Sequence, residues 1–165
     1  MNINAIEIVL IEAKYNTAIA AIIRAALEEF GANKPGTVYF DSSTDALYEL
    51  FNTTANSQYY IALQNNIVVG GAGIFPTEGL PNNTCELVKM YLHPSARNIG
   101  LGKKMIQFCM ASAKQLGFTK LYLETLPELN KAVKVYENLG FQYLDKPLGN
   151  SGHTGCNIWM IQDVV

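Results

Sequence analysis

The stretch RNIGLG at residues 97–102 is the part of the sequence that decides the fold. It follows a strand-like run, Cys85–Leu92, and leads into a segment with helical spacing of apolar residues that begins with Lys103 and Lys104 in its first turn. Glycines let a backbone approach a ligand closely, and the free amides and positive dipole of a helix N-terminus favour a phosphate anion. The stretch predicts a site for a pyrophosphate-bearing cofactor. The alternative is a plain turn in which the glycines only relieve steric strain.

The spacing of this stretch excludes two common phosphate-binding loops. A Walker-type loop requires glycine where Arg97 stands and serine or threonine where Lys104 stands. A dinucleotide-binding fingerprint requires a third glycine where Met105 stands, and it normally lies in the first strand-turn-helix unit of its fold. ATP and NAD are therefore not the expected ligands.

Apolar periodicity and turn residues around this stretch predict alternating strands and helices. Ser43 or Thr44 is expected to cap the second helix, and Asn65-Asn66 is expected to join two strands in a hairpin. The expected helices are Asn16–Phe30, Thr44–Asn52, 101–116 and Glu128–Leu139, and the expected strands are Ile6–Ile11, Gln58–Leu63, Val68–Phe75, Cys85–Leu92, Lys120–Glu124, Phe141–Leu144 and Asn157–Ile161.

A second motif, NKAVKVYENLGF, occupies residues 130–141. Together with Arg97, Gly100 and Gly102, it resembles the two signatures of the GNAT family of N-acetyltransferases, in the family's order. Asn98 departs from the pattern, because many members carry glycine there. The resemblance covers residues 68–144 well, and the preceding part of the chain matches only in its order of elements.

The resemblance implies an α/β fold, with a mixed, mostly antiparallel sheet of six or seven strands and helices on both faces, built as one domain over residues 1–165. It also implies direct transfer of the acetyl group of acetyl-CoA, the cosubstrate, to a primary amine of a small molecule or peptide, without an acetyl-enzyme. A non-catalytic acyl-CoA-binding regulatory module is the alternative. A homodimer is compatible with the resemblance.

The same resemblance assigns residues to the cofactor. In the family, exposed backbone amides of the strand before the loop pair with pantetheine, the loop holds the pyrophosphate, and an asparagine at the start of the second motif binds the pantetheine amides. The cofactor-binding residues expected on this basis are Met90, Tyr91, Leu92, Arg97, Asn98, Ile99, Gly100, Leu101, Gly102, Lys103 and Asn130.

Two side chains are the candidates for acid-base chemistry. Acetyl transfer needs a neutral amine, and Glu86 lies at the position where a branch of the family carries its base. An ordinary glutamate at a strand end, paired or facing water, is the alternative. Tyr136 occupies the family's position for the acid that assists the departing thiolate, although it also falls on an apolar helix face and can be a core aromatic.

The acceptor side is less well defined by the sequence. By resemblance it is lined by residues 30–41 and the last strands, where Tyr39 and Phe40 can shape it and His153 can reach it. A loop histidine without further function is the alternative for His153. The sequence does not identify the amine.

Composition narrows the remaining classes of function. The formal net charge of −2 and a pI near 5.7 argue against nucleic acid as a partner. The first 15 residues lack the pattern of a signal peptide, and no apolar run reaches the roughly 20 residues of a membrane span. We therefore expect a cytoplasmic protein without a membrane partner.

The cysteines and histidines give no metal-binding pattern. Cys85, Cys109 and Cys156 are widely spaced, and His93 and His153 lie far from one another. We expect reduced thiols, two of them in the core, and no metal.

Overall fold

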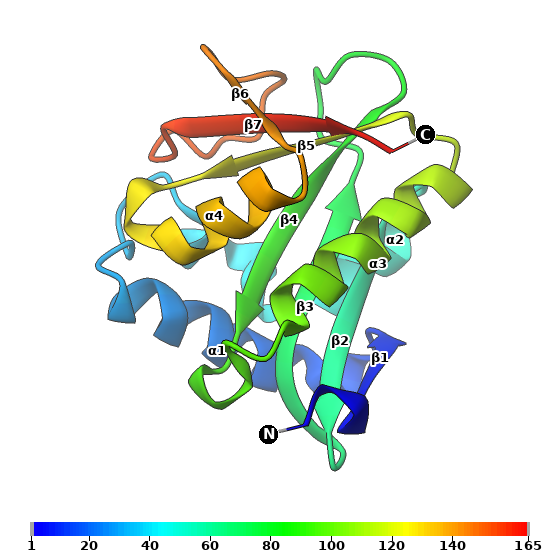
Figure 1. The fold of residues 1–165 in the computed structure, drawn as a ribbon, viewed down its shortest axis with the longest axis vertical. Helices are drawn as coiled ribbons and strands as arrows, with labels where there is room; N and C mark the ends of the chain where they lie inside the picture. Colours follow the sequence, from blue (N-terminus) through cyan, green and yellow to red (C-terminus); the bar gives the residue numbers. More distant parts are fainter. Residues whose placement is uncertain (1, 165) are drawn as a thin grey trace.

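A computed structural model describes residues 2–164 as one seven-stranded sheet with helices on both sides (Figure 1). The strand order is β1-β2-β3-β4-β5-β7-β6, and neighbouring strands are antiparallel except for the parallel pair β4 and β5. The strands are β1 (Ile6–Leu10), β2 (Gln58–Gln64), β3 (Ile67–Phe75), β4 (Thr84–Leu92), β5 (Lys120–Thr125), β6 (Gln142–Leu144) and β7 (Ile158–Asp163), and the α-helices are α1 (Asn16–Glu29), α2 (Leu47–Thr53), α3 (Leu101–Gln115) and α4 (Asn130–Asn138).

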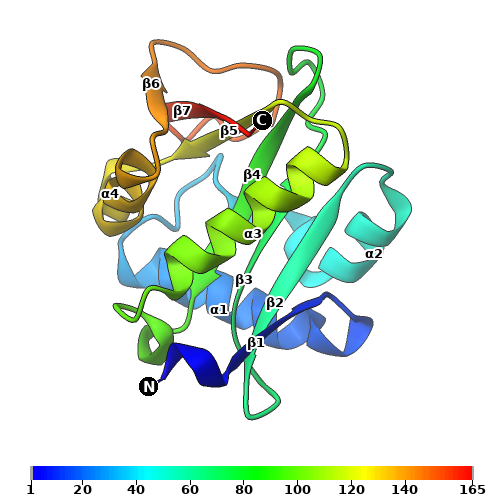
Figure 2. The same ribbon diagram turned by 45° about the vertical axis from the view of Figure 1, so that its right-hand side comes forward.

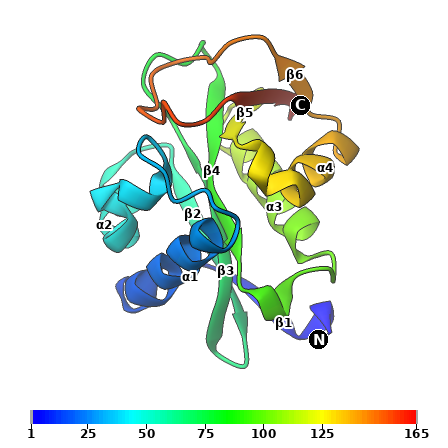
Figure 3. The ribbon, with the colours of Figure 1, turned by 90° about the vertical axis from the view of Figure 1, so that its left-hand side faces the viewer.

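Two hydrophobic cores lie on opposite faces of the sheet. Helices α1 and α2 cover one face, and α3 and α4 cover the other (Figures 2 and 3). Successive residues of β2 alternate between the cores, with Tyr59 and Ile61 beneath α1 and α2, and Tyr60 and Ala62 beneath α3. The expected mixed, mostly antiparallel sheet with helices on both faces is confirmed. None of the described helices is long and apolar enough to cross a bilayer.

The start of the second helix was predicted wrongly. Helix α2 begins at Leu47, and the preceding residues, Ser42–Asp45, form a separate 3-10 turn. The Thr44 hydroxyl donates a hydrogen bond to the Val38 carbonyl at 3.1 Å, so it stabilises the preceding loop. No side chain caps α2 at its first residue, and capping by Ser43 or Thr44 is therefore not observed.

Smaller boundary errors have similar local causes. A 3-10 turn at Pro127–Leu129 precedes α4, which begins at Asn130 and not at Glu128. The last two strands do pair with each other, as expected, but β7 lies between β5 and the edge strand β6. Isolated 3-10 turns are common at helix ends and are hard to distinguish from helix by periodicity.

Strands β4 and β5 separate along the middle of the sheet. Their parallel pairing covers only Thr84, Cys85 and Glu86 on β4, whereas β4 continues to Leu92. The segment Leu87–Leu92 therefore has no β5 partner, and its backbone groups on that side need other partners. Figure 1 shows the two strands diverging, with α4 beside the opening.

A bulge at Lys89 bends β4 where this opening begins. Between the pairs Gly73–Val88 and Gly71–Tyr91, β4 contains one residue more than β3. Lys89 lies in this extra stretch and has a positive φ of 48°. The Tyr59 hydroxyl donates a hydrogen bond to the Lys89 carbonyl at 2.7 Å. A Cβ atom on Gly71 or Gly73 would come within 2.7 Å of the Tyr59 ring, so these glycines make room for the tyrosine that holds the bulge.

Candidate active site

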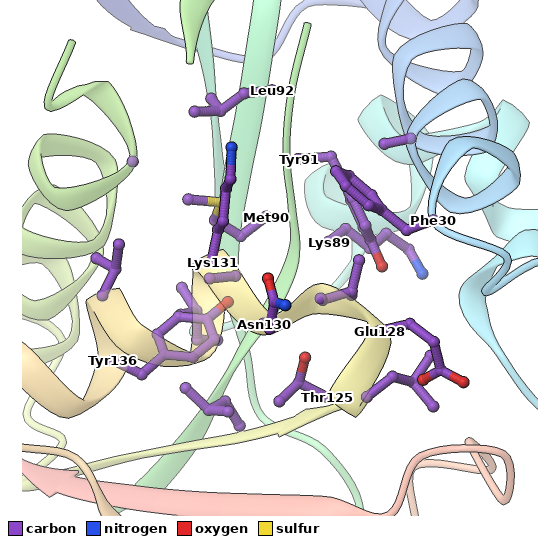
Figure 4. A pocket seen from close by; sticks show the side chains of 18 of the residues that line it. Phe30, Lys89, Met90, Tyr91, Leu92, Thr125, Glu128, Asn130, Lys131 and Tyr136 are labelled. Atoms are coloured by element: carbon purple, nitrogen blue, oxygen red, sulfur yellow. The ribbon is translucent and has the colours of Figure 1, made fainter. Parts of the chain in front are cut away.

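A cleft of about 470 Å³ lies along the open edge of β4. Residues of β4 line one side, α4 and the end of β5 line the other, and the first turn of α3 closes one end. Figure 4 shows Met90 and Leu92 of β4 facing the space into which Asn130 and Tyr136 of α4 also project. The cleft has the elongated lining expected for a cofactor that pairs with a free strand edge.

The turn before α3 leaves the helix N-terminus open. Asn98 and Gly100 have positive φ angles of 62° and 85°, and no side chain caps the helix at Gly100. Asparagine tolerates this left-handed conformation better than most residues, which explains how Asn98 can replace the family's glycine. The first amides of α3 and its positive dipole end are therefore available to an anion in the cleft.

Arg97 binds protein groups in this structure. Its guanidinium forms an ion pair with Glu29 at 2.9 Å, lies 5.1 Å from the centroid of the Phe30 ring, and donates a hydrogen bond from Nε to the Leu92 carbonyl at 3.1 Å. Arg97 thus ties the turn to the end of α1 and to β4. Its position next to the cleft is as expected, but its described contacts position the loop.

The structure brings most of the predicted site residues together. The side chains of Ile99 and Leu101 do not line the cleft, because Ile99 packs against the core beneath α3 and Leu101 belongs to that core, with 1% of its surface exposed. The Leu101 amide is nevertheless the first of α3. The predicted residues that line the cleft are Glu86, Met90, Tyr91, Leu92, Arg97, Asn98, Gly100, Gly102, Lys103, Asn130 and Tyr136.

Glu86 is buried where β4 and β5 diverge. Its Oε2 accepts a hydrogen bond from the Thr77 hydroxyl at 2.5 Å, and only 3% of its surface is exposed. Burial raises the pKa of Glu86 to about 7, and the nearby Glu124 carboxylate adds to this, against the opposing effects of Thr77, His153 and Lys89. A carboxyl group with a pKa near neutrality can accept and release protons at physiological pH.

Tyr136 has a buried ring and a hydroxyl group without a described partner. The ring packs edge-on against Phe141, at 5.7 Å between centroids, and 6% of the residue is exposed. Among the described residues, none forms a hydrogen bond with its hydroxyl, which Figure 4 shows directed into the cleft. Burial raises the pKa of Tyr136 well above its ordinary value, so the phenol stays protonated and can donate a hydrogen bond.

Hydrogen bonds connect three polar side chains beside the cleft, those of Asp41, Lys89 and His153. Asp41 accepts hydrogen bonds from Lys89 Nζ at 3.1 Å and from His153 Nε2 at 2.8 Å. Burial acts to raise the pKa of Asp41, but the hydrogen bond from His153 and the charge of Lys89 outweigh it and lower the pKa to about 2. Asp41 is therefore ionised at neutral pH, and it compensates the charge of the buried Lys89.

Glu124 holds the loop that carries His153. It accepts hydrogen bonds from the hydroxyls of Tyr122 and Ser151, and the Ser151 oxygen in turn accepts one from the backbone amide of His153. One carboxylate oxygen of Glu86, one of Glu124 and a ring nitrogen of His153, atoms of the kind that can bind a metal ion, lie within 4.8 Å of one another. Each of the three side chains is already bonded to another protein group, so the cluster is accounted for by internal hydrogen bonds.

A second cavity, of about 280 Å³, adjoins the cleft. Four residues line both spaces: Glu86, Val88, Lys89 and His153. Tyr39 and Phe40, expected to shape the acceptor side, line neither space. Tyr39 donates a hydrogen bond to Glu28, and 62% of Phe40 is exposed.

Sequence reasoning did not single out Lys89, Thr77 or Glu124, and it included Asp41 only as the last residue of the segment 30–41. Lys89 is the one charged residue in the stretch Leu87–Leu92 of β4, and because lysine is rarely buried without a partner, this position could have been noticed from the sequence. The other three give no local signal, since each acts through a residue distant in the chain.

This arrangement suits an enzyme that holds an extended, phosphate-bearing donor and transfers a group from its inner end. The chain belongs to the GNAT acetyltransferase family, whose sequence model matches residues 19–141. It is 39% identical over 151 residues to the uncharacterized N-acetyltransferase YjgM of Escherichia coli K12, a match that covers 90% of this chain and 89% of the relative.

Solved structures show the same fold. A GNAT-family acetyltransferase from Staphylococcus aureus Mu50 superimposes with a TM-score of 0.85 at 22% identity, covering 98% of this chain and all of that one. The putative acetyltransferase yncA from Salmonella typhimurium, solved with its cofactor acetyl-CoA, has a TM-score of 0.76 at 18% identity over 98% of this chain and 95% of that one.

Proposed function

We propose that this protein transfers the acetyl group of acetyl-CoA directly to a primary amine of a small molecule or peptide. The observation that carries the proposal is the position of Glu86, a buried carboxyl in the wall between the cleft and the second cavity. A donor in the cleft and an amine in the second cavity would both lie beside Glu86, which lines the two spaces. A non-catalytic acyl-CoA-binding module needs neither the second cavity nor a carboxyl with a pKa near 7.

The donor binds, in this proposal, to the two sets of backbone groups left free by the fold. The first amides of α3 receive the pyrophosphate, because the N-terminus is uncapped and faces the cleft. The edge of β4 at Met90, Tyr91 and Leu92 that lacks a β5 partner receives the pantetheine amides, with Asn130 opposite, while the Leu92 carbonyl stays bonded to Arg97. Arg97 acts here as a positioning residue that fixes the turn between these two parts.

Transfer proceeds by attack of the neutral amine on the thioester carbonyl carbon. A new C–N bond forms, Glu86 accepts the proton lost from nitrogen, and the C–S bond breaks. The electron pair of that bond leaves on sulfur, where the Tyr136 hydroxyl stabilises the thiolate by hydrogen-bond donation. Because burial raises the pKa of Tyr136, a hydrogen bond to sulfur is favoured over complete transfer of its proton, and the thiolate is protonated from solvent on release.

Acetyl-CoA is expected to raise the melting temperature, whereas ATP is not. At a concentration about 100 times Kd, a ligand that binds only the folded state contributes about 2.7 kcal/mol, which corresponds to roughly 5–10 °C for a chain of this length. Differential scanning fluorimetry measures the shift. Equal stabilisation by ATP would contradict a donor site built for both pyrophosphate and pantetheine.

Variants of Gly100 localise this binding. Gly100→Asp places a carboxylate at the open N-terminus of α3, and should weaken acetyl-CoA binding at least about tenfold more than Gly100→Ala does. Both variants carry a side chain at a φ of 85°, so their difference isolates the charge. Equal affinity of the two variants would place the pyrophosphate elsewhere.

A further inference from the structure

The second cavity has an apolar half formed by α2, β3 and β4. Leu50 and Phe51 of α2, Phe75 of β3 and Val88 of β4 line it, and the rings of Phe51 and Phe75 pack edge-on with centroids 5.5 Å apart. These side chains can pack against a ligand and exclude water from it, but they form no hydrogen bonds with it. They suit an aliphatic or aromatic group of a ligand.

The polar half of this cavity lacks an uncompensated cation among the described residues. Lys89 is its one lysine or arginine, and Nζ is paired with Asp41, which also binds His153. The remaining ionisable residues in the lining are Glu78, which is exposed, and Glu86. A carboxylate placed here would meet like charges without a free guanidinium or ammonium group to balance it.

We propose that the acceptor is an apolar monoamine, a primary amine that carries an alkyl or arylalkyl group and no carboxylate. The inference rests on the proposed function and specifies its substrate class. The amine is directed to Glu86 at the shared wall, and its apolar group lies against Phe51, Phe75 and Val88. An α-amino acid is disfavoured by its carboxylate. A polyamine is disfavoured because burying its further ammonium groups beside the apolar half costs more than pairing with the exposed Glu78 carboxylate returns.

Four acceptors test the proposal with acetyl-CoA held at saturation. They are 2-phenylethylamine, L-phenylalanine, L-phenylalaninamide and spermidine, and acetylated product is measured by mass spectrometry. We expect kcat/KM for 2-phenylethylamine to exceed that for phenylalanine and spermidine by roughly 10- to 100-fold. Phenylalaninamide, which is similar in size to phenylalanine but lacks its carboxylate, should recover most of the loss.

A charge reversal at Glu78 provides the matched variant. Glu78 is exposed at the cavity mouth, so Glu78→Lys adds a free cation without disturbing the core. It should raise kcat/KM for phenylalanine, relative to kcat/KM for 2-phenylethylamine, about tenfold or more. Glu7→Lys makes the same change on the exposed side of edge strand β1 and should leave the ratio unchanged.

The outcomes separate this inference from the proposed function. Acetylation that favours phenylalanine or spermidine in the wild-type enzyme would overturn the substrate class and leave acetyl transfer intact. An unchanged ratio in Glu78→Lys would also overturn it, because the cavity would then not hold the acceptor. Failure to acetylate any of the four amines would overturn the substrate class, whereas acetyl transfer itself would be overturned only if a wider panel with aminoglycosides and peptides also gave no N-acetyl product.

Discussion

Replacing Tyr136 by phenylalanine is expected to lower kcat by roughly 10²-fold or more while the Kd for acetyl-CoA and the melting temperature stay close to wild type. The substitution keeps the ring that packs against Phe141. It removes only a hydroxyl that bonds to no described residue, so no buried partner loses its hydrogen bond. Steady-state kinetics, calorimetric titration and thermal melting separate chemistry from binding and stability.

Tyr143→Phe is the control for this experiment. Tyr143 lies on the exposed edge strand β6, and its hydroxyl donates a hydrogen bond to Glu137 of α4, so removing it should leave kcat unchanged. A Tyr136→Phe enzyme with full activity would return Tyr136 to a packing role, with departure of the thiolate unassisted or helped by water.

Replacing Glu86 by glutamine is expected to lower kcat/KM by about 10²-fold or more near pH 7. Glutamine can still accept the hydrogen bond from Thr77, but it cannot take a proton from the amine. The loss should shrink as the pH rises, because a larger share of the amine arrives neutral and needs no base. A pH series of kcat/KM for both enzymes checks this, with Glu7→Gln as a remote control. A loss that is the same at every pH would contradict the role of base.

The same substitution should stabilise the fold at alkaline pH. The pKa of Glu86 is raised from 4.5 to about 7 in the folded state, so the folded protein binds the additional proton between these values. The stabilisation that this bound proton provides is fully present below about pH 4.5 and is lost as the pH rises through about 7. Glu86→Gln does not suffer this loss, and its melting temperature should exceed that of wild type at pH 8 by several degrees, but not at pH 4.5. If the melting temperatures of the variant and the wild type differ by the same amount at pH 4.5 and at pH 8, the result would argue against a buried carboxylate at Glu86.

Local sequence patterns were sufficient for much of the fold. The glycines of residues 97–102 indicated the turn before α3. Gly100 has a positive φ angle, which explains why glycine is needed at that position. Unbroken runs of apolar residues on either side of Asn65-Asn66 indicated β2 and β3, and helical spacing of apolar residues indicated α1 and α3. Helices α1 and α3 each bury one face, whereas β2 contributes to both cores, and in each case the spacing of apolar residues reports these contacts directly.

The features that sequence patterns did not indicate depend on contacts between distant segments. The bulge at Lys89 is held by Tyr59, which lies 30 positions earlier, and Asp41 and His153 are 112 positions apart. Such pairings arise only once the sheet has set which loops lie together. The family resemblance could assign Glu86 and Tyr136, but not the network that surrounds Glu86 or the second cavity beside it.

Acetyl transfer itself is tested most directly by measuring both products of one reaction. The protein is incubated with acetyl-CoA and a panel of primary amines that includes monoamines, amino acids, polyamines, aminoglycosides and peptides. We expect at least one amine to yield its N-acetyl derivative and free CoA thiol in equal amounts, with both products reduced in parallel by Glu86→Gln and Tyr136→Phe. Thiol release without an amide product, or no reaction with any amine although acetyl-CoA binds, would contradict the proposed function.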